Sequence, residues 1–315
     1  MPKLKPHDQI PVTKDSLARI LNAYDIADFT FQPISGGIEN TSCVVRSAGK
    51  EYVLRIYAQR GKHDADIMLE IRFQDYLREH GIPIPLIYLN KEGKELTLSE
   101  IDGKAWQCVL MEFVEGESVT ERPPESLIAE LGRLQARMHI LGMEFAQTEG
   151  VPQEPRTELY DTLTSRIADI PVKGKDVPEF IERVKAYRYR FAQDLPSGYC
   201  HTDIDFDGNV ITKGEKIAGV IDFDDLEYVP LVMCLGYSLW NLMDDEGIDA
   251  MHGYLEEYEK VRPLSSRERE ALPHVILWRN YEVGIIRLLL WDETTPEEDI
   301  TRILELEKEI PGIIL

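Results

Sequence analysis

The sequence predicts an α+β fold with two lobes, in which a small antiparallel sheet lobe with one helix precedes a large, mainly helical lobe. Two patterns support this prediction. Short strand-like runs alternate with glycine turns in the first hundred residues, and apolar residues recur at helical spacing over most of the chain after Phe113. We expect the first lobe to span residues 1–112, the second residues 113–315, and the hinge to lie at about 112–118.

The first lobe begins with three predicted strands, at residues 30–34, 41–46 and 51–57. A helix follows from about Ala65 to Glu79, because Leu69, Phe73, Tyr76 and Leu77 recur at helical spacing. Gly81 and Pro83 end this helix, since glycine favours the position after a helix and proline cannot continue one. Two further strands, around Leu96 and at residues 107–113, complete a five-stranded sheet.

The second lobe begins with a helix whose buried face is predicted by an apolar stripe, formed by Leu127, Leu131, Leu134, Met138 and Leu141. Residues 209–222 interrupt the helical pattern as a hairpin that turns at 213–215. Further helices are expected at 180–191, 231–243, 251–258, 266–290 and 297–308.

Composition excludes several classes of protein. The 315 residues are 43% hydrophobic and 29% charged, as in an ordinary globular protein, and no apolar run approaches the ~20 residues that span a bilayer. The formal net charge of −22 argues against a nucleic-acid partner, whose phosphates need clustered Lys and Arg. It favours a cationic or zwitterionic small molecule, although a solvated acidic surface explains the same charge.

The N-terminal residues lack the apolar core of a secretory signal, so we expect a cytoplasmic protein without a membrane partner. The four cysteines, Cys43, Cys108, Cys200 and Cys234, are scattered in apolar surroundings. They show neither metal-ligand spacing nor a disulfide framework, and we expect reduced core residues.

The strongest functional signal is an acidic segment with a His-x-Asp, then an Asn, then an apolar run that ends in Ile-Asp-Phe. Phosphoryl transfer needs a carboxylate that takes the proton of the attacking hydroxyl. It also needs an amide and a second carboxylate that hold Mg²⁺ against the phosphates of ATP. Asp203 is the candidate for the first role, and Asn209 and Asp222 are the candidate metal ligands.

These two segments resemble the catalytic and metal loops of the aminoglycoside phosphotransferase and choline kinase superfamily, whose fold is protein-kinase-like. The run Gly-Gly-Ile-Glu-Asn-Thr-Ser from Gly36 also resembles the corresponding loop of its homoserine kinases. The resemblance implies an ATP- and Mg²⁺-dependent kinase for a hydroxyl of a small polar molecule. Homoserine or a related amino alcohol is the first expectation, and an aminoglycoside or choline-type acceptor is the alternative.

The resemblance also assigns a nucleotide site. Gly36 and Gly37 would cover the phosphates, and Arg55 stands where the family places a lysine that Glu70 orients. Backbone groups around Glu112 and Val114 would meet the adenine edge.

Three departures from the family pattern leave alternatives open. Asp203 and Asn209 are six residues apart where the family has five, so either the loop contains a one-residue bulge or Asp205 replaces Asp203 as the base. Cys234 stands where many relatives have a bracing aspartate, and Arg55 replaces the lysine. A non-catalytic nucleotide-binding scaffold is therefore the competing hypothesis.

Overall fold

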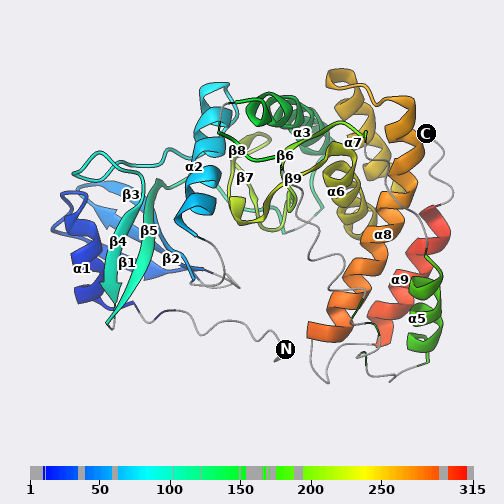
Figure 1. Cartoon of the computed structure of the whole chain (residues 1–315), viewed down its shortest axis with the longest axis horizontal. Helices are drawn as coiled ribbons and strands as arrows, with labels where there is room; N and C mark the ends of the chain where they lie inside the picture. Colours follow the sequence, from blue (N-terminus) through cyan, green and yellow to red (C-terminus); the bar gives the residue numbers. More distant parts are fainter. Residues whose placement is uncertain are drawn as a thin grey trace.

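The structure of the protein is a computed structural model, which describes residues 10, 12–34, 40–58, 63–101, 103–120, 122–148, 150–153, 165, 167, 170, 175–187, 194–290 and 297–310. Figure 1 shows the sheet at one end of the molecule and the C-terminal helices at the other, with α2 and short strand pairs between them. The predicted α+β fold is confirmed. The proposed hinge lies in the connection between the last strand of the sheet, which ends at Glu112, and a helix that begins at Glu125.

The first lobe contains a five-stranded sheet with strand order β1-β2-β3-β5-β4, in which all neighbours are antiparallel. Its elements are α1 (Lys14–Asn22), β1 (Thr30–Pro33), β2 (Thr41–Ser47), β3 (Lys50–Ile56), α2 (Asp64–Glu79), β4 (Thr97–Ile101) and β5 (Lys104–Glu112).

Helix α1 was not predicted, although the sequence carries its signals. Leu17, Ile20 and Leu21 are fully buried at helical spacing, and Thr13 and Ser16 form a reciprocal capping box. The described residues of the first lobe therefore form two helices and not one.

The two helices cover opposite faces of the sheet, because successive side chains of a strand alternate between its faces. In β5, Cys108 and Leu110 belong to the apolar cluster that contains α1 residues. Val109 belongs to a separate cluster with Ile67 and Ile71 of α2. Helix α2 ends as the sequence predicts, with Gly81 in the left-handed region at a φ of 76°.

The second lobe contains α3 (Glu125–Ala146), α5 (Val177–Ala186), α6 (Leu231–Asp245), α7 (Ile248–Val261), α8 (Ser266–Leu290) and α9 (Glu297–Glu309). Its short strands are β6 (Ser197–His201), β7 (Val210–Thr212), β8 (Ile217–Val220) and β9 (Leu226–Pro230), with the 3₁₀ turn η2 (Phe223–Asp225) before β9. Strands β7 and β8 form the predicted hairpin, whereas the antiparallel pair β6 and β9 was not predicted.

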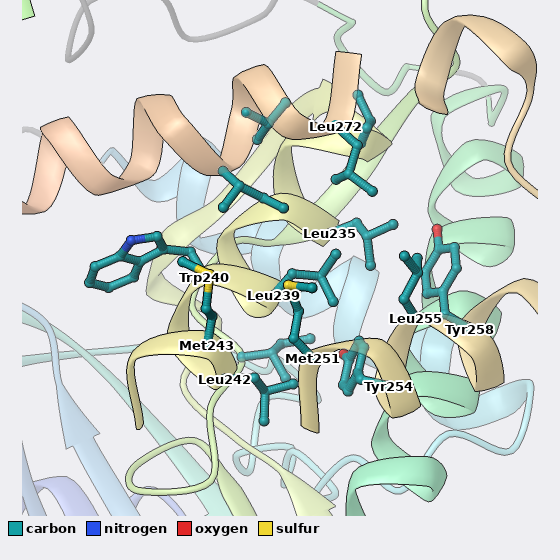
Figure 2. Packing of buried hydrophobic residues seen from close by; sticks show 14 of the residues in the cluster. Leu235, Leu239, Trp240, Leu242, Met243, Met251, Tyr254, Leu255, Tyr258 and Leu272 are labelled. Carbon is teal, nitrogen blue, oxygen red and sulfur yellow. The ribbon is translucent and has the colours of Figure 1, made fainter. Parts of the chain in front are cut away.

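Aromatic residues of the C-terminal helices serve packing. Figure 2 shows Trp240 among leucine and methionine side chains of the core. Its indole N–H donates to Asn280 Oδ1 at 2.9 Å, and Trp240, Trp278 and Tyr281 are all buried. Such residues are closed to a ligand, while Trp291 lies outside the described residues.

Helix α3 and strand β6 approach so closely that glycine is required between them. A Cβ atom built on Gly142 would lie 2.1 Å from the Tyr199 carbonyl oxygen, and one on Gly198 would lie 2.7 Å from the Met143 nitrogen. Because β6 ends at His201, this contact fixes where the following acidic loop (residues 202–209), predicted to be the catalytic loop, begins.

We predict that Gly142→Ala lowers the free energy of unfolding by about 1–3 kcal/mol, because the added methyl group forces α3 away from β6. Urea denaturation measures this change. Gly253→Ala is the matched control, since a Cβ on this α7 residue meets nothing within 4 Å, and it should be neutral or stabilise by about 0.5–1 kcal/mol. Equal free energies for the two variants would contradict the close contact.

Candidate active site

His201 connects the two acidic loops. Its buried ring lies with Nε2 2.9 Å from the Ile221 carbonyl oxygen and with Nδ1 3.3 Å from the Asp203 backbone nitrogen. Because a carbonyl only accepts and a backbone N–H only donates, Nε2 carries the proton and the ring is neutral. Both ring nitrogens form hydrogen bonds, so His201 orients the loop and has no nitrogen left to take a substrate proton.

Other hydrogen bonds hold the same two loops together. The Ile221 N–H donates to the Asn209 carbonyl at 2.9 Å, and the Thr202 hydroxyl donates to the Asp225 carbonyl at 2.9 Å. Asp222 therefore begins its loop from a position that is fixed relative to Asp203.

The structure brings Asp203 and Asn209 together despite the additional residue. Asn209 Nδ2 donates to the Asp203 carbonyl at 2.7 Å and to Asp203 Oδ2 at 3.0 Å. The extra length is absorbed in a turn that Asp205 closes, since Asp205 Oδ1 accepts from the Gly208 N–H at 2.8 Å and from the Asn209 N–H at 3.4 Å. Asp205 thus shapes the loop while the Asp203 carboxylate meets the amide.

Arg55 of β3 reaches across to the metal loop. Its Nη1 lies 3.0 Å from Asp222 Oδ1 and 3.1 Å from Asp224 Oδ1. Burial alone would lower the pKa of the Arg55 guanidinium, but Asp224 and Asp222 raise it, so Arg55 stays charged. Burial would likewise raise the pKa of Asp222, but the charge and hydrogen bond of Arg55, together with His201 and the Asp224 backbone, outweigh burial and lower it.

Asp224 links the lobes through a second residue that the sequence did not single out. Asn40 donates its amide N–H to Asp224, and its side-chain oxygen accepts from the Ala58 N–H at 2.9 Å. Asn40 lies in the Gly-Gly-Ile-Glu-Asn-Thr-Ser run, but that run does not indicate its partner, because the contact joins residues that are distant in the sequence.

Glu70 is buried in α2 beside Arg55. Its Oε1 accepts from the Tyr57 hydroxyl at 3.0 Å and from Gln74 Nε2 at 3.3 Å. Glu70 also contributes to the negative field that raises the pKa of Arg55. Its charge therefore acts on Arg55, while Tyr57 and Gln74 hold its carboxylate in place.

The segment that the sequence predicts to face adenine is partly constrained. The Glu112 N–H donates to the Leu86 carbonyl at 2.8 Å, so a nucleotide base would have to use the Glu112 carbonyl. The Val114 side chain packs over Gly219, where a Cβ would lie 2.8 Å from Val114 Cγ1. Gly36 and Gly37 lie outside the described residues.

Cys234 braces the catalytic loop itself. With a cysteine in place of the aspartate, the sequence predicts that support of the loop comes from elsewhere, for example from Asp205 or Asp207. Asp205 does close the turn, but the prediction is wrong for Cys234, whose thiol donates to the His201 carbonyl at 3.1 Å. A thiol can make the contact because a carbonyl oxygen accepts from any nearby donor.

A cavity of about 490 Å³ lies beside the catalytic loop. Its acidic lining residues are Asp205 and Asp207 of the loop, Asp245 at the end of α6 and the adjacent Glu246, and Arg122 is also in its lining. Partial burial, together with neighbouring carboxylates, raises the pKa of Asp245 to about 6. Sequence reasoning missed Arg122 and Asp245, since no motif or spacing marks them.

The fold and this site define a class of enzyme. A sheet lobe and a helical lobe meet at two linked acidic loops, which the buried guanidinium of Arg55 contacts. This is an arrangement for phosphoryl transfer.

In the parts of the chain that the structure describes, no helix is long and apolar enough to cross a membrane.

The family follows from a profile match. The profile of the phosphotransferase enzyme family matches residues 30–272, so the chain belongs to that family. The homoserine kinase of Xanthobacter autotrophicus is 29% identical over 290 residues, which are 89% of this chain and 87% of that protein. The homoserine kinase of Agrobacterium fabrum is 29% identical over 296 residues, 90% of this chain and 88% of that protein.

Solved structures share the fold. A microcompartment-associated aminopropanol kinase superimposes with a TM-score of 0.72 at 17% identity, over 96% of this chain and 98% of that chain. An amicoumacin kinase, solved in complex with AMP-PNP, Ca²⁺ and Ami, has a TM-score of 0.68 at 20% identity over 96% of each chain. With the family and the homoserine kinase relatives, the chain is a kinase that phosphorylates a hydroxyl of a small molecule.

We predict that Arg55→Gln moves the acidic limb of the pH profile of kcat/KM upward by about one pH unit or more. Arg55 lowers the pKa of Asp222 and so keeps this carboxylate ionised as the pH falls. Without the guanidinium, Asp222 takes up its proton at a higher pH and activity is lost there. Initial rates at a series of pH values measure the shift.

Arg46→Gln is the control. Arg46 lies on β2, beside the strand β3 that carries Arg55, and its Nε forms an exposed ion pair with Glu51 Oε1 at 2.5 Å. Its profile should match that of the wild type. An unchanged acidic limb in Arg55→Gln would show that Asp222 does not depend on Arg55 for its charge.

Proposed function

We propose that this kinase uses ATP and Mg²⁺ to phosphorylate the hydroxyl of homoserine or a related amino alcohol. The observation that carries the proposal is the cavity beside the catalytic loop, which contains four carboxylates and Arg122 among its described lining residues. Extended similarity to two homoserine kinases supports the same acceptor class.

Asp203 is the residue to which we assign the acceptor proton. The hydrogen bond from Asn209 orients the Asp203 carboxylate, and the His201 ring holds its backbone. Since the transition state of phosphoryl transfer is loose, the carboxylate aligns the hydroxyl and takes its proton late.

The residues that would hold Mg²⁺ offer the oxygen donors that a hard cation requires. Asp222 supplies a carboxylate, and Asn209 supplies its side-chain oxygen, because the amide nitrogen is already bonded to Asp203. When bound, the ion neutralises charge on the phosphates. This fit rests on the chemistry of the two side chains.

Nucleotide binding would draw on the other lobe. We assign Arg55 to the phosphates, Gly36 and Gly37 to their cover, and the backbone of Glu112 and Val114 to the adenine edge. A chain with a net charge of −22 repels ATP at long range, so a buried arginine at the junction provides a local attraction. The negative charge of Glu70 helps to keep this arginine charged.

The cavity suits a zwitterion. Arg122, whose Nε lies 3.5 Å from Glu246 Oε2, would pair with a carboxylate of the acceptor. The carboxylates of Asp205, Asp207 and Asp245 would attract the ammonium group of the acceptor. The excess of carboxylates favours an acceptor that carries an amine, as in amino alcohols generally.

Three other interpretations have less support. A choline-type acceptor would need exposed aromatic faces, whereas Trp240, Trp278 and Tyr281 are buried in packing. An aminoglycoside would also satisfy an acidic cavity, and the acceptor panel below includes one. A non-catalytic scaffold would not need Asp203 and Asn209 in hydrogen-bond contact.

We predict that Asp203→Asn lowers kcat by about 10²–10⁴ with little change in the KM for ATP, because the variant cannot accept a proton. Asp205→Asn should keep most of its kcat, since an asparagine oxygen still accepts the N–H bonds that close the turn. Mg²⁺-dependent ADP release with homoserine, ethanolamine, choline and an aminoglycoside measures both variants.

The reverse ranking of the two variants would make Asp205 the base. If ATP binds and no acceptor stimulates its consumption in the wild type, the scaffold hypothesis replaces the kinase proposal for these acceptors.

We predict that Arg122→Gln raises the KM for homoserine about tenfold, which corresponds to the loss of one charged hydrogen bond of about 1.4 kcal/mol. An amino alcohol without a carboxylate, such as ethanolamine, is the matched control, and its KM should not rise. Steady-state kinetics with both acceptors separate the two effects. A parallel rise for both would show that Arg122 does not recognise the carboxylate.

A further inference from the structure

Three side chains that the proposed reaction does not use meet in the core behind the catalytic loop. They are His139 of α3, Cys200 of β6 and Cys234 of α6, each about 1% exposed. Their potential ligand atoms, one nitrogen and two sulfurs, all lie within 4.8 Å of one another. The sequence predicted no metal-ligand spacing, and the cluster arises only because the fold joins three distant segments.

The imidazole of His139 is engaged on one side only. Its Nδ1 lies 2.6 Å from the Tyr258 hydroxyl, which also accepts an N–H from Arg262 at 3.2 Å. Its Nε2 is buried and has no hydrogen-bond partner within the described part of the chain. Buried polar atoms are usually paired, and a metal-bound histidine is characteristically fixed by a hydrogen bond to its other nitrogen. His139 has this arrangement.

The surroundings of the sulfurs suit a thiolate. Gln135 Nε2 lies 3.5 Å from Cys234 Sγ, and the amide is fixed by Ser238 Oγ at 2.7 Å and by the Tyr254 hydroxyl at 2.8 Å. An N–H donor that points at sulfur stabilises negative charge there. Two thiolates and a neutral imidazole would balance the charge of a divalent cation, which a buried site requires.

We propose that His139, Cys200 and Cys234 form a binding site for a thiophilic divalent cation of the zinc type. Sulfur and imidazole ligands are the set that zinc prefers, and they differ from the oxygen ligands assigned to Mg²⁺. Binding releases the two thiol protons to solvent and forms two metal–sulfur bonds and one metal–nitrogen bond. The ion would crosslink α3, β6 and α6 directly behind His201.

The burial of the three residues determines how the ion would enter. Because the core is closed around the cluster, the metal is taken up while the chain folds, as metal binding and folding are coupled in such sites. The Cys234 thiol now donates to the His201 carbonyl, so metallation exchanges this bond for a covalent link between β6 and α6. Occupancy would therefore stiffen the base of the catalytic loop.

The test is to refold the full-length chain with one equivalent of Co²⁺, which replaces zinc and gives a thiolate-to-metal charge-transfer band. We expect one equivalent of Co²⁺ with this band, and its loss when Zn²⁺ displaces the cobalt. The Mg²⁺ site contains no sulfur and cannot produce the band, so the result is independent of the kinase reaction. Zinc retained after gel filtration, measured by mass spectrometry, gives the stoichiometry.

Cys200→Ser, Cys234→Ser and His139→Gln should each reduce the retained metal at least tenfold. Cys43→Ser is the matched control, because Cys43 is equally buried but lies in the sheet lobe, and it should retain one equivalent. A folded wild-type protein without the charge-transfer band or retained zinc would overturn the proposal. If a variant fails to fold, the wild-type spectrum decides.

Discussion

The geometry of the active site depends on the two hydrogen bonds of one neutral imidazole. His201 donates to the residue before Asp222 and accepts from the backbone of Asp203, so a single buried ring sets the distance between the two acidic loops. Its own position is imposed from outside, since β6 is held against α3 by a contact that only glycine permits. Rigid elements thus carry a loop whose residues must be placed accurately.

Repulsion between neighbouring carboxylates is the second constraint on the geometry of the site. Carboxylates that gather for metal and substrate binding repel one another, and burial makes the repulsion stronger. Arg55 offsets this in the absence of ligand by contacting both Asp222 and Asp224 from the opposite lobe. The same guanidinium therefore stabilises the junction of the lobes and places its own positive charge where phosphates are expected. Asn40 adds a neutral link to Asp224, so the contact between the lobes does not rest on charge alone.

Strand β6 has two functions at its end because neighbouring side chains point to opposite faces. His201 faces the acidic loops, while Cys200 faces α3 and α6 and lies close to His139 and Cys234. Cys234 therefore belongs both to the hydrogen bond that supports the His201 carbonyl and to the proposed metal cluster. A change in the state of that sulfur would be transmitted to the catalytic loop over one hydrogen bond.

The sequence by itself determined the α+β class and most helices and strands, and it predicted the catalytic and metal-binding roles of Asp203, Asn209 and Asp222, because periodicity and short motifs are local properties. Helix α1 was also readable from its capping box and was overlooked. Only the tertiary structure decided that Asp205 closes the turn, that Cys234 supports His201, that Arg122 and Asp245 face one cavity, and that two cysteines meet a histidine. These are contacts between segments far apart in the chain, which no local pattern encodes, and packing of the whole core is what brings them within bonding distance.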